Sequence, residues 1–256
     1  MPQLDIHQFP CLSDNFGVLI HDRASGQTAS IDAPDAVAVK AALAAKGWRL
    51  THILTTHHHA DHVGGNEALK AETKCTIIGP RQEAAKIPGI DGKVGDGDSF
   101  RFGEFEVRVL ETPGHTAGHI SYWIPEARAA FVGDTMFAMG CGRLLEGDAR
   151  MMWTSLSKLM KLPRETALYC GHEYTLANGT FAIGIEPENK ALQARVEEVK
   201  ALRVAGKPTL PTSLGLELDT NPFLRAPNAA IRKRLGMESA ADWEVFGEVR
   251  ERKNRG

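Results

Sequence analysis

The residues best suited to chemistry are histidines and aspartates gathered in one short segment. Residues 56–65, THHHADHVGG, follow a strand-like run at 50–55 and precede a short helical run. Imidazole nitrogens and carboxylate oxygens are common ligands of zinc, iron and manganese. A tight loop can direct alternate side chains at two neighbouring ions, so the segment predicts a metal site. On this segment alone, a solvated polar loop that binds metal only adventitiously stays open as an alternative.

Three further segments carry the same kinds of side chain, each where a strand-like run ends. They are TPGHTAGH at 112–119, GDT at 133–135 and CGHE at 170–173. One histidine at a strand end is more often a hydrogen-bonded structural residue than a ligand. Four such loops on one rim are difficult to explain structurally, and they favour one shared site.

Short strands and helices alternate through the first two-thirds of the chain. Strand-like runs lie at 4–9, 16–21, 28–33, 50–55, 75–78, 105–110, 120–124, 130–132 and 167–170. Helical runs lie at 36–46, 66–71 and 152–162. This mixture indicates an α/β layered domain over 1–174.

The character of the chain changes after residue 174, where no convincing strand remains. Helical spacing at 187–205 and from 239 to the end predicts two helices, joined by a proline-containing extended segment at 207–228. We therefore expect a smaller helical domain over 175–256.

The histidine and aspartate motifs resemble those of the metallo-β-lactamase superfamily, which have the form T-H-x-H-x-D-H, G-H-T-x-G-H, G-D-T and G-H-E. The resemblance implies an αββα sandwich that holds two metal ions. It also implies a ligand set in which one ion is held by His57, His59 and His115, the other by Asp61, His62 and His172, and both by a bridging Asp134.

Other histidines are not expected to bind metal. His58 occupies the variable position of the first motif, and His119 is expected to orient its loop by hydrogen bonding. No partner motif accompanies His7, His21 or His52, so we expect structural roles for them.

Two adjacent divalent ions, about 3.5–4 Å apart, can hold a bridging hydroxide and polarise a carbonyl. Such a site suits hydrolysis of an acyl bond or a phosphoester. We expect two divalent ions per chain, with zinc as the leading candidate and iron or manganese as alternatives. Asp61 is the candidate catalytic residue, because it could orient the hydroxide or carry its proton.

Further segments resemble the glyoxalase II (hydroxyacylglutathione hydrolase) family: MGCGRLLEG at 139–147, CGHEYT at 170–175, TNPFLR at 220–225 and RERK at 250–253. In that family the helical domain supplies cations for the glutathione carboxylates. The resemblance implies that the substrate contacts are Arg143, Leu145, Tyr174, Arg250 and Lys253.

The sequence departs from that family at two of these positions. Arg143 stands where many members have lysine, and Leu145 stands where members often have tyrosine. Arg250 and Lys253 are three residues apart, so one helix face can present both to an anion. The alternative is a solvated helix end whose cations complement the dipole.

The predicted reaction is hydrolysis of S-2-hydroxyacylglutathione to the hydroxy acid and glutathione. The leading candidate substrate is S-D-lactoylglutathione, which would give D-lactate and glutathione. This is the second step of methylglyoxal detoxification in the family. A thiol with a pKa near about 8.5 leaves without a strong general acid. The alternatives are a glutathione persulfide dioxygenase with a single iron and a non-catalytic metal-binding scaffold.

Composition limits the partners. The chain has 256 residues with 30 basic and 32 acidic side chains, so no overall basic field favours nucleic acid or an anionic membrane. Residues 1–174 hold 17 basic and 21 acidic side chains, whereas 175–256 hold 13 and 11. Without a leader-like segment or a C-x-x-C motif, we expect a cytoplasmic protein. We also expect the protein to be a monomer.

Overall fold

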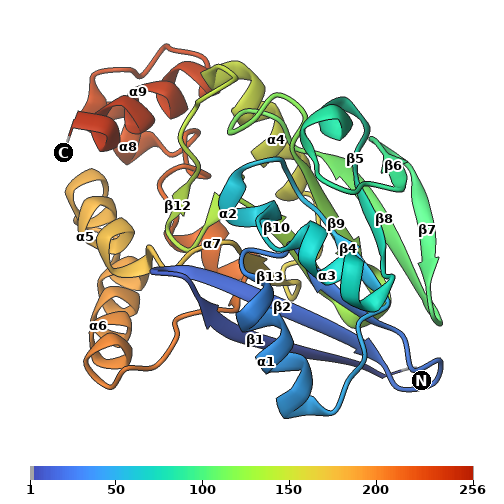
Figure 1. Cartoon of the computed structure of the whole chain (residues 1–256). Helices are drawn as coiled ribbons and strands as arrows, with labels where there is room; N and C mark the ends of the chain where they lie inside the picture. The colour runs from blue at the N-terminus through green and yellow to red at the C-terminus, as the bar shows by residue number, and fades with distance from the viewer. Residues whose placement is uncertain (1–2, 256) are drawn as a thin grey trace. The chain divides into compact units, whose positions relative to one another are not determined.

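The computed structural model describes residues 3–255, which form two compact units interleaved along the chain. The first unit extends to Glu111 and includes Thr116–Gly133, and the second combines Thr112–His115 with the chain from Asp134 onward. Figure 1 labels most of their helices and strands. The units are defined by packing alone, so they do not test the predicted division after residue 174, which stays a prediction.

The first unit contains a mixed six-stranded sheet in the order β1-β2-β3-β4-β5-β6. The first three strands pair antiparallel, and β3 to β6 pair parallel. The strands are β1 (Leu4–Cys11), β2 (Asn15–Asp22), β3 (Thr28–Ile31), β4 (His52–Leu54), β5 (Thr76–Pro80) and β6 (Gly92–Val94). Because parallel neighbours need long crossovers, helices and turns separate the later strands.

Three α-helices lie among these strands: α1 (Ala36–Lys46), α2 (Ala60–Val63) and α3 (Asn66–Thr73). Figure 1 shows α1 alongside β1 and β2. Val39 and Leu43 on α1 share one buried cluster with Leu19, Ile53 and Ile77 of the sheet. Burying one such aliphatic side chain is worth about 1.5–3 kcal/mol, so this contact holds the helix on the sheet.

A second group of antiparallel strands in this unit has the order β10-β9-β8-β7. The strands are β7 (Ser99–Phe102), β8 (Phe105–Glu111), β9 (Ile120–Ile124) and β10 (Ala129–Gly133). Two short 3-10 helices, η1 (Arg81–Lys86) and η2 (Pro125–Ala127), also lie in this unit. The buried Tyr122 hydroxyl on β9 donates to the carbonyls of Thr55 and Ile78, at 2.8 and 3.2 Å. The two layers of strands therefore face each other across a shared core.

The second unit is mainly helical. Its elements are β11 (Met136–Phe137), β12 (Gly140–Cys141), α4 (Ala149–Leu159), β13 (Ala167–Cys170), α5 (Thr175–Ile185), α6 (Lys190–Val204), β14 (Thr212–Ser213), α7 (Leu214–Thr220), α8 (Ala229–Leu235) and α9 (Asp242–Arg255). Met139 packs with Ala182 of α5 and with Leu192 and Val196 of α6 in a buried cluster. The hairpin β11–β12 is thus anchored on two helices.

The prediction of an extended segment at 207–228 is wrong in part, because this stretch contains β14 and α7. The Ser213 side chain accepts a hydrogen bond from the Leu216 amide and starts α7. Helices α5 and α8 were not predicted. The α5 sequence TLANGTFAIGI has two glycines and little amphipathic pattern, so hydrophobic periodicity does not reveal it.

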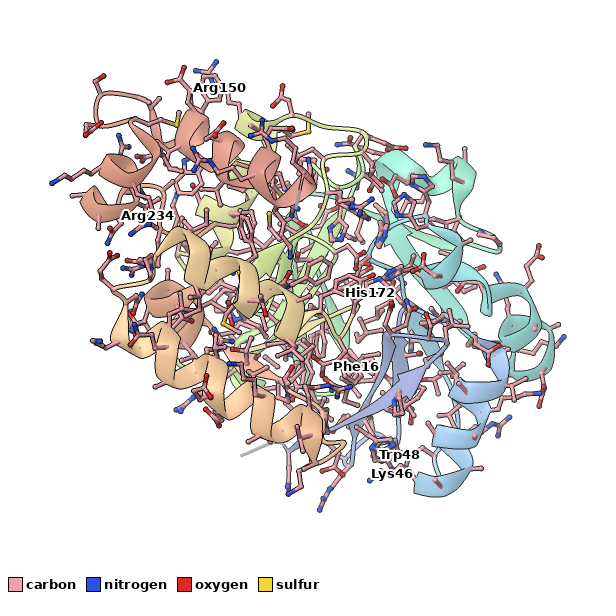
Figure 2. All side chains as sticks on the ribbon, turned by 90° about the vertical axis from the view of Figure 1, so that its left-hand side faces the viewer. Phe16, Lys46, Trp48, Arg150, His172 and Arg234 are labelled. Atoms are coloured by element: carbon pink, nitrogen blue, oxygen red, sulfur yellow. The ribbon has the colours of Figure 1, made fainter. Side chains whose placement is uncertain are left out.

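All three histidines that lack a motif have aromatic neighbours in the first unit, and His21 is one example. His21 stacks on Trp48 with ring centroids 4.6 Å apart, and its Nδ1 lies 2.9 Å from Thr28 Oγ1. Lys46 covers the same indole at 5.9 Å, and Figure 2 shows these two side chains together. Within 3–255, no helix has the length and apolar character needed to cross a bilayer.

Candidate active site

The loop after β4 brings predicted metal ligands together within the first unit. His57 Nε2 lies 3.2 Å from His59 Nδ1. Two nitrogens bound to one zinc ion at about 2.0–2.1 Å would lie roughly 3–3.5 Å apart. The spacing of this pair therefore suits a shared ion.

Asp32, which follows β3, orients two imidazoles of this loop. Its carboxylate accepts hydrogen bonds from the Thr56 amide and hydroxyl at 2.7 and 2.8 Å, and it lies 2.8 Å from His62 Nδ1. Since the Thr56 hydroxyl donates to Asp32, it accepts from His57 Nδ1 at 2.9 Å. Both imidazoles then carry their proton on Nδ1 and use Nε2 for metal. The sequence does not predict this role of Asp32, whose only signal is an acid directly after a strand.

Glu83 on η1 holds the two histidine-containing loops of this unit. Its buried carboxylate accepts from the amides of His58 at 2.8 Å and Gly118 at 2.9 Å, and lies 2.9 Å from His58 Nδ1. A Cβ at position 118 would come within 2.7 Å of the Glu83 side chain, so glycine permits the close approach. Next to Gly118, His119 stacks on His57 with centroids 4.9 Å apart.

The second unit holds the remaining three predicted ligands. Asp134 Oδ2 lies 3.5 Å from His115 Nε2 and 3.2 Å from His172 Nε2, and all three side chains are buried. His115 Nδ1 donates to the Arg143 carbonyl at 3.0 Å, which leaves Nε2 as its metal-binding atom. A carboxylate oxygen between two imidazoles suits a ligand shared by two cations.

The donor chemistry of both units fits divalent metal ions. In the first unit, Asp32, His57 and His62 offer donor atoms within 4.8 Å of one another. Every predicted ligand supplies nitrogen or carboxylate oxygen, which suits zinc, iron or manganese. These His/Asp clusters are consistent with a binuclear metal site.

The second unit also contains a cavity of about 840 Å³. It is lined by six of the predicted residues: His115, Asp134, Arg143, Tyr174, Arg250 and Lys253. Arg255 adds a fourth cationic side chain. Leu145 does not line this cavity and is 58% exposed. The cavity therefore joins candidate metal ligands to cations that can bind an anionic substrate.

Two of the cationic side chains of α9, Arg250 and Lys253, are fixed by neighbouring groups. Arg250 is 5% exposed, and its Nη1 donates to the Cys141 carbonyl at 2.9 Å. Lys253 Nζ donates to the Ala177 carbonyl at 3.2 Å and lies 5.2 Å from the Phe181 ring centre. Burial, reinforced by Arg250, lowers the pKa of Lys253. These contacts preorganise both cations at the cavity.

Aromatic rings form another part of the cavity wall. Tyr174 stacks on His172 with centroids 4.9 Å apart and planes 3° apart. Phe137 meets both rings edge-on, at 5.9 Å from His172 and 5.3 Å from Tyr174. The sequence does not predict this role of Phe137, because a single buried aromatic residue carries no distinctive signal.

Comparisons with known proteins agree with this geometry. The family model "Metallo-beta-lactamase superfamily" matches residues 24–172, and "Hydroxyacylglutathione hydrolase C-terminus" matches 173–256. The hydroxyacylglutathione hydrolase of Brucella anthropi is 59% identical over 253 residues, covering 99% of this chain and 97% of that protein. The chain belongs to the hydroxyacylglutathione hydrolase family.

One more relative supports this membership, and one solved structure supports the fold. The hydroxyacylglutathione hydrolase of Rhizobium meliloti is 57% identical over 254 residues, covering 99% of each chain. The crystal structure of ETHE1 from Myxococcus xanthus is 28% identical with a TM-score of 0.70, covering 98% of this chain and 91% of that one. The predicted fold class is confirmed: a metallo-beta-lactamase α/β sandwich, followed by a helical hydroxyacylglutathione hydrolase C-terminal region.

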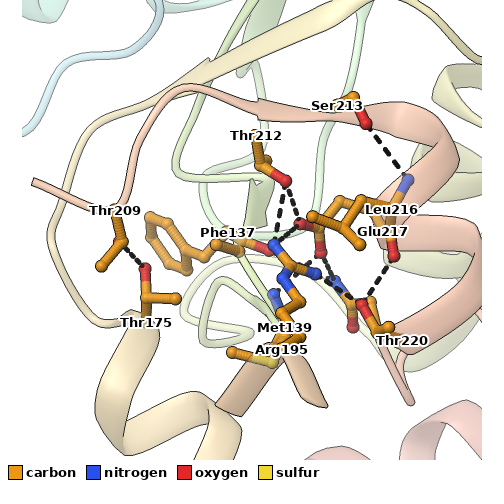
Figure 3. A network of polar contacts seen from close by, with 12 residues as sticks. Phe137, Met139, Thr175, Arg195, Thr209, Thr212, Ser213, Leu216, Glu217 and Thr220 are labelled. Atoms are coloured by element: carbon orange, nitrogen blue, oxygen red, sulfur yellow. Dashed lines mark hydrogen bonds and ion pairs between the residues drawn. The ribbon is translucent and has the colours of Figure 1, made fainter. Parts of the chain in front are cut away.

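In this member of the hydroxyacylglutathione hydrolase family, a buried polar network supports the hairpin that carries Phe137. Glu217 pairs with Arg195 and accepts from Thr212 Oγ1 at 2.7 Å and from the Met139 amide at 2.8 Å. Figure 3 shows Arg195 and Glu217 at the centre of these contacts. Met139 has a φ of +54°, which is unusual for a side chain of this type, so the Glu217 contact stabilises a strained turn.

Asparagine side chains hold the rest of this turn. Asn221 Nδ2 donates to the carbonyls of Phe137 and Gly140, at 3.2 and 3.0 Å. Asn178 Nδ2 donates to the Ala138 carbonyl at 3.1 Å. Because side chains satisfy these buried backbone groups, the turn is rigid and Phe137 is held at the cavity.

The cysteines near the ligands are expected to be chemically inert. Burial raises the pKa of Cys141 to about 11 and also raises the pKa of Cys170, so neither is a thiolate at neutral pH. We predict no alkylation of either thiol by iodoacetamide at pH 7 in the folded protein, and alkylation of both after unfolding in urea, as measured by mass spectrometry. Rapid labelling of folded Cys141 would contradict the assignment.

Proposed function

We propose that this protein hydrolyses the thioester of S-2-hydroxyacylglutathione to the hydroxy acid and glutathione. The leading candidate substrate is S-D-lactoylglutathione, which gives D-lactate and glutathione. The observation that carries the proposal is the cavity of the second unit. Its lining includes the candidate metal ligands His115 and Asp134 and the cationic side chains of Arg143, Arg250 and Lys253. Metal ligands beside cations suit a substrate that has both an acyl bond and carboxylates. The names of the Brucella and Rhizobium relatives support the same substrate.

We propose that the ligand set binds two divalent ions. Zinc is the leading candidate, and iron and manganese are the alternatives. His57, His59 and His115 would hold one ion; Asp61, His62 and His172 would hold the other; Asp134 would contact both. When bound, such ions lower the pKa of water and polarise a carbonyl. The buried carboxylate of Asp32 orients His57 and His62 for this task.

The protein's own side chains would bind the substrate and accept the proton of the attacking water. The Asp61 carboxylate would accept the proton of the attacking water, while Arg143, Arg250 and Lys253 would bind the glutathione carboxylates. Tyr174 and Phe137 would exclude water from one side of the thioester. The departing thiol has a pKa near about 8.5, so no side chain has to protonate it.

We also propose that the protein is located in the cytoplasm. All four cysteines are free and buried, which agrees with the reducing cytoplasm. The monomeric state remains a prediction.

A comparison of two thioesters tests the substrate proposal. The same lactoyl group is presented on glutathione and on N-acetylcysteamine, which lacks both carboxylates. Loss of charge-assisted contacts worth about 1.5–3 kcal/mol each is expected to lower kcat/KM by about 10² or more for N-acetylcysteamine. Equal kcat/KM values would show that the cations do not recognise the peptide part.

Lys253→Ala is expected to raise KM for S-D-lactoylglutathione about tenfold or more and to leave the metal content at two ions, because one charge-assisted contact is lost. Steady-state kinetics and elemental analysis check this. Lys200→Ala is the matched control, since Lys200 lies on α6 paired with Glu197 and outside the cavity. An unchanged KM in Lys253→Ala would remove this side chain from the substrate site.

A further inference from the structure

Asn15 makes two contacts with the candidate catalytic residue Asp61. Its Nδ2 donates to the Asp61 carbonyl at 3.2 Å and to the Asp61 carboxylate oxygen Oδ2 at 3.1 Å, across 46 residues of sequence. Both partners are acceptors only, so the amide nitrogen, and not the amide oxygen, must face Asp61. Both residues lie in the first unit.

The sheet holds Asn15 in a fixed place. It is the first residue of β2 and pairs with Cys11 at the end of the β1–β2 hairpin. Asn15 is 4% exposed, and the next residue, Phe16, is also buried. A donor anchored in this way loses little conformational entropy when it binds a partner.

Asp61, in contrast, is partly exposed to solvent. It lies in the four-residue helix α2, and 42% of its side chain is exposed. A carboxylate with this exposure can be reached by water. The Asn15 amide fixes one carboxylate oxygen, and it fixes the backbone of the same residue.

The neutral charge of the donor is also important. The His62 Nε2 atom lies 3.7 Å from Asp61 Oδ2, so a proposed metal-binding atom is close to the same oxygen. A lysine or arginine at position 15 would place a positive charge beside divalent ions and oppose their binding. An amide provides hydrogen-bond donors without that repulsion.

We propose that Asn15 is a positioning residue for the metal-binding and catalytic carboxylate of Asp61. The proposal rests on the proposed function for the role of Asp61. The contact fixes the orientation of the carboxylate, whose Oδ2 lies 3.7 Å from His62 Nε2, and so positions Asp61 toward the metal ion and the attacking water. Removal of the amide therefore weakens metal binding and slows turnover without changing the cations that bind the substrate.

The test uses Asn15→Leu in the full-length chain, which replaces the amide with an apolar group of similar size. Zinc titration of the metal-free protein measures two affinities without any substrate. Loss of a contact that orients a ligand typically costs 10–100-fold in metal affinity or activity. We expect the weaker of the two zinc affinities to fall by about that factor, kcat to fall similarly, and KM to stay within about twofold.

Asn66→Leu is the matched control. Asn66 is also a buried asparagine of the first unit, and its Nδ2 donates to the Pro88 carbonyl at 3.3 Å instead of to a proposed ligand. We expect Asn66→Leu to lower the melting temperature while both zinc affinities stay at the wild-type values. Asn15→Gln, which keeps the amide donor, should restore part of the zinc affinity and also serves if Asn15→Leu does not fold.

Two results would overturn the proposal. One is equal zinc affinities in Asn15→Leu, Asn66→Leu and the wild type, and the other is equally weak zinc binding in Asn15→Gln and Asn15→Leu. A wild-type protein that binds two zinc ions but hydrolyses no thioester would instead refute the proposed function, and the zinc titrations would still decide the role of Asn15.

Discussion

Replacing Asp134 with alanine is expected to remove at least one of the two divalent ions and to lower thioester hydrolysis by about 10³-fold or more. The Oδ2 atom of Asp134 lies 3.5 Å from His115 Nε2 and 3.2 Å from His172 Nε2, so the substitution removes the carboxylate proposed to contact both ions. Metal ions contribute several kcal/mol to such reactions, and each 1.4 kcal/mol is a factor of ten in rate. Elemental analysis and steady-state kinetics measure both effects.

Asp98→Ala is a suitable control for that experiment. Asp98 lies in the first unit, between β6 and β7, where its carboxylate accepts hydrogen bonds from Arg81 and the Gly95 amide. Its loss should leave the metal content and kcat unchanged. Two ions and full turnover in Asp134→Ala would contradict the assignment of Asp134 as a shared ligand.

Arg195→Met is expected to destabilise the protein by about 3–5 kcal/mol, because it leaves the buried Glu217 carboxylate without its cation. Glu217 is fully buried, and Arg195 also contacts the hydroxyls of Thr212 and Thr220. Urea unfolding, followed by circular dichroism, measures the free energy of unfolding.

The same helix offers a matched control for Arg195. Lys200 on α6 pairs with Glu197 in solvent, with about half of its side chain exposed, and an exposed pair contributes at most about 1 kcal/mol. Lys200→Met should therefore change the free energy of unfolding only slightly. Equal losses in Arg195→Met and Lys200→Met would show that the buried network does not stabilise the second unit.

Much of the candidate site is visible in the sequence because metal ligation requires particular residue types at short spacing. His57, His59, Asp61 and His62 fall within six residues, and such density has few structural explanations. Strands 120–124 and 167–170 and helix 36–46 match the structure in full, because their hydrophobic runs end at clear breaks.

The supporting residues could not be predicted in the same way. Asn15, Asp32 and Glu83 contact the ligand loop from 24 to 46 residues away in sequence, and no local pattern distinguishes them from other polar residues. Their roles arise only when the strands of the first unit bring distant segments together. Helix α8 shows a different limit: its cap at Asn228 and its end at Gly236 were readable signals, but its seven residues are too short for a clear periodicity.

One measurement tests the central claim most directly: metal-loaded protein is incubated with S-D-lactoylglutathione while D-lactate, glutathione and dissolved oxygen are followed. We predict equimolar D-lactate and glutathione without oxygen uptake, with activity lost on chelation and restored by zinc. The claim would be contradicted by an absence of turnover in protein that holds two metal ions. It would equally be contradicted by oxygen consumption with glutathione persulfide at one iron per chain.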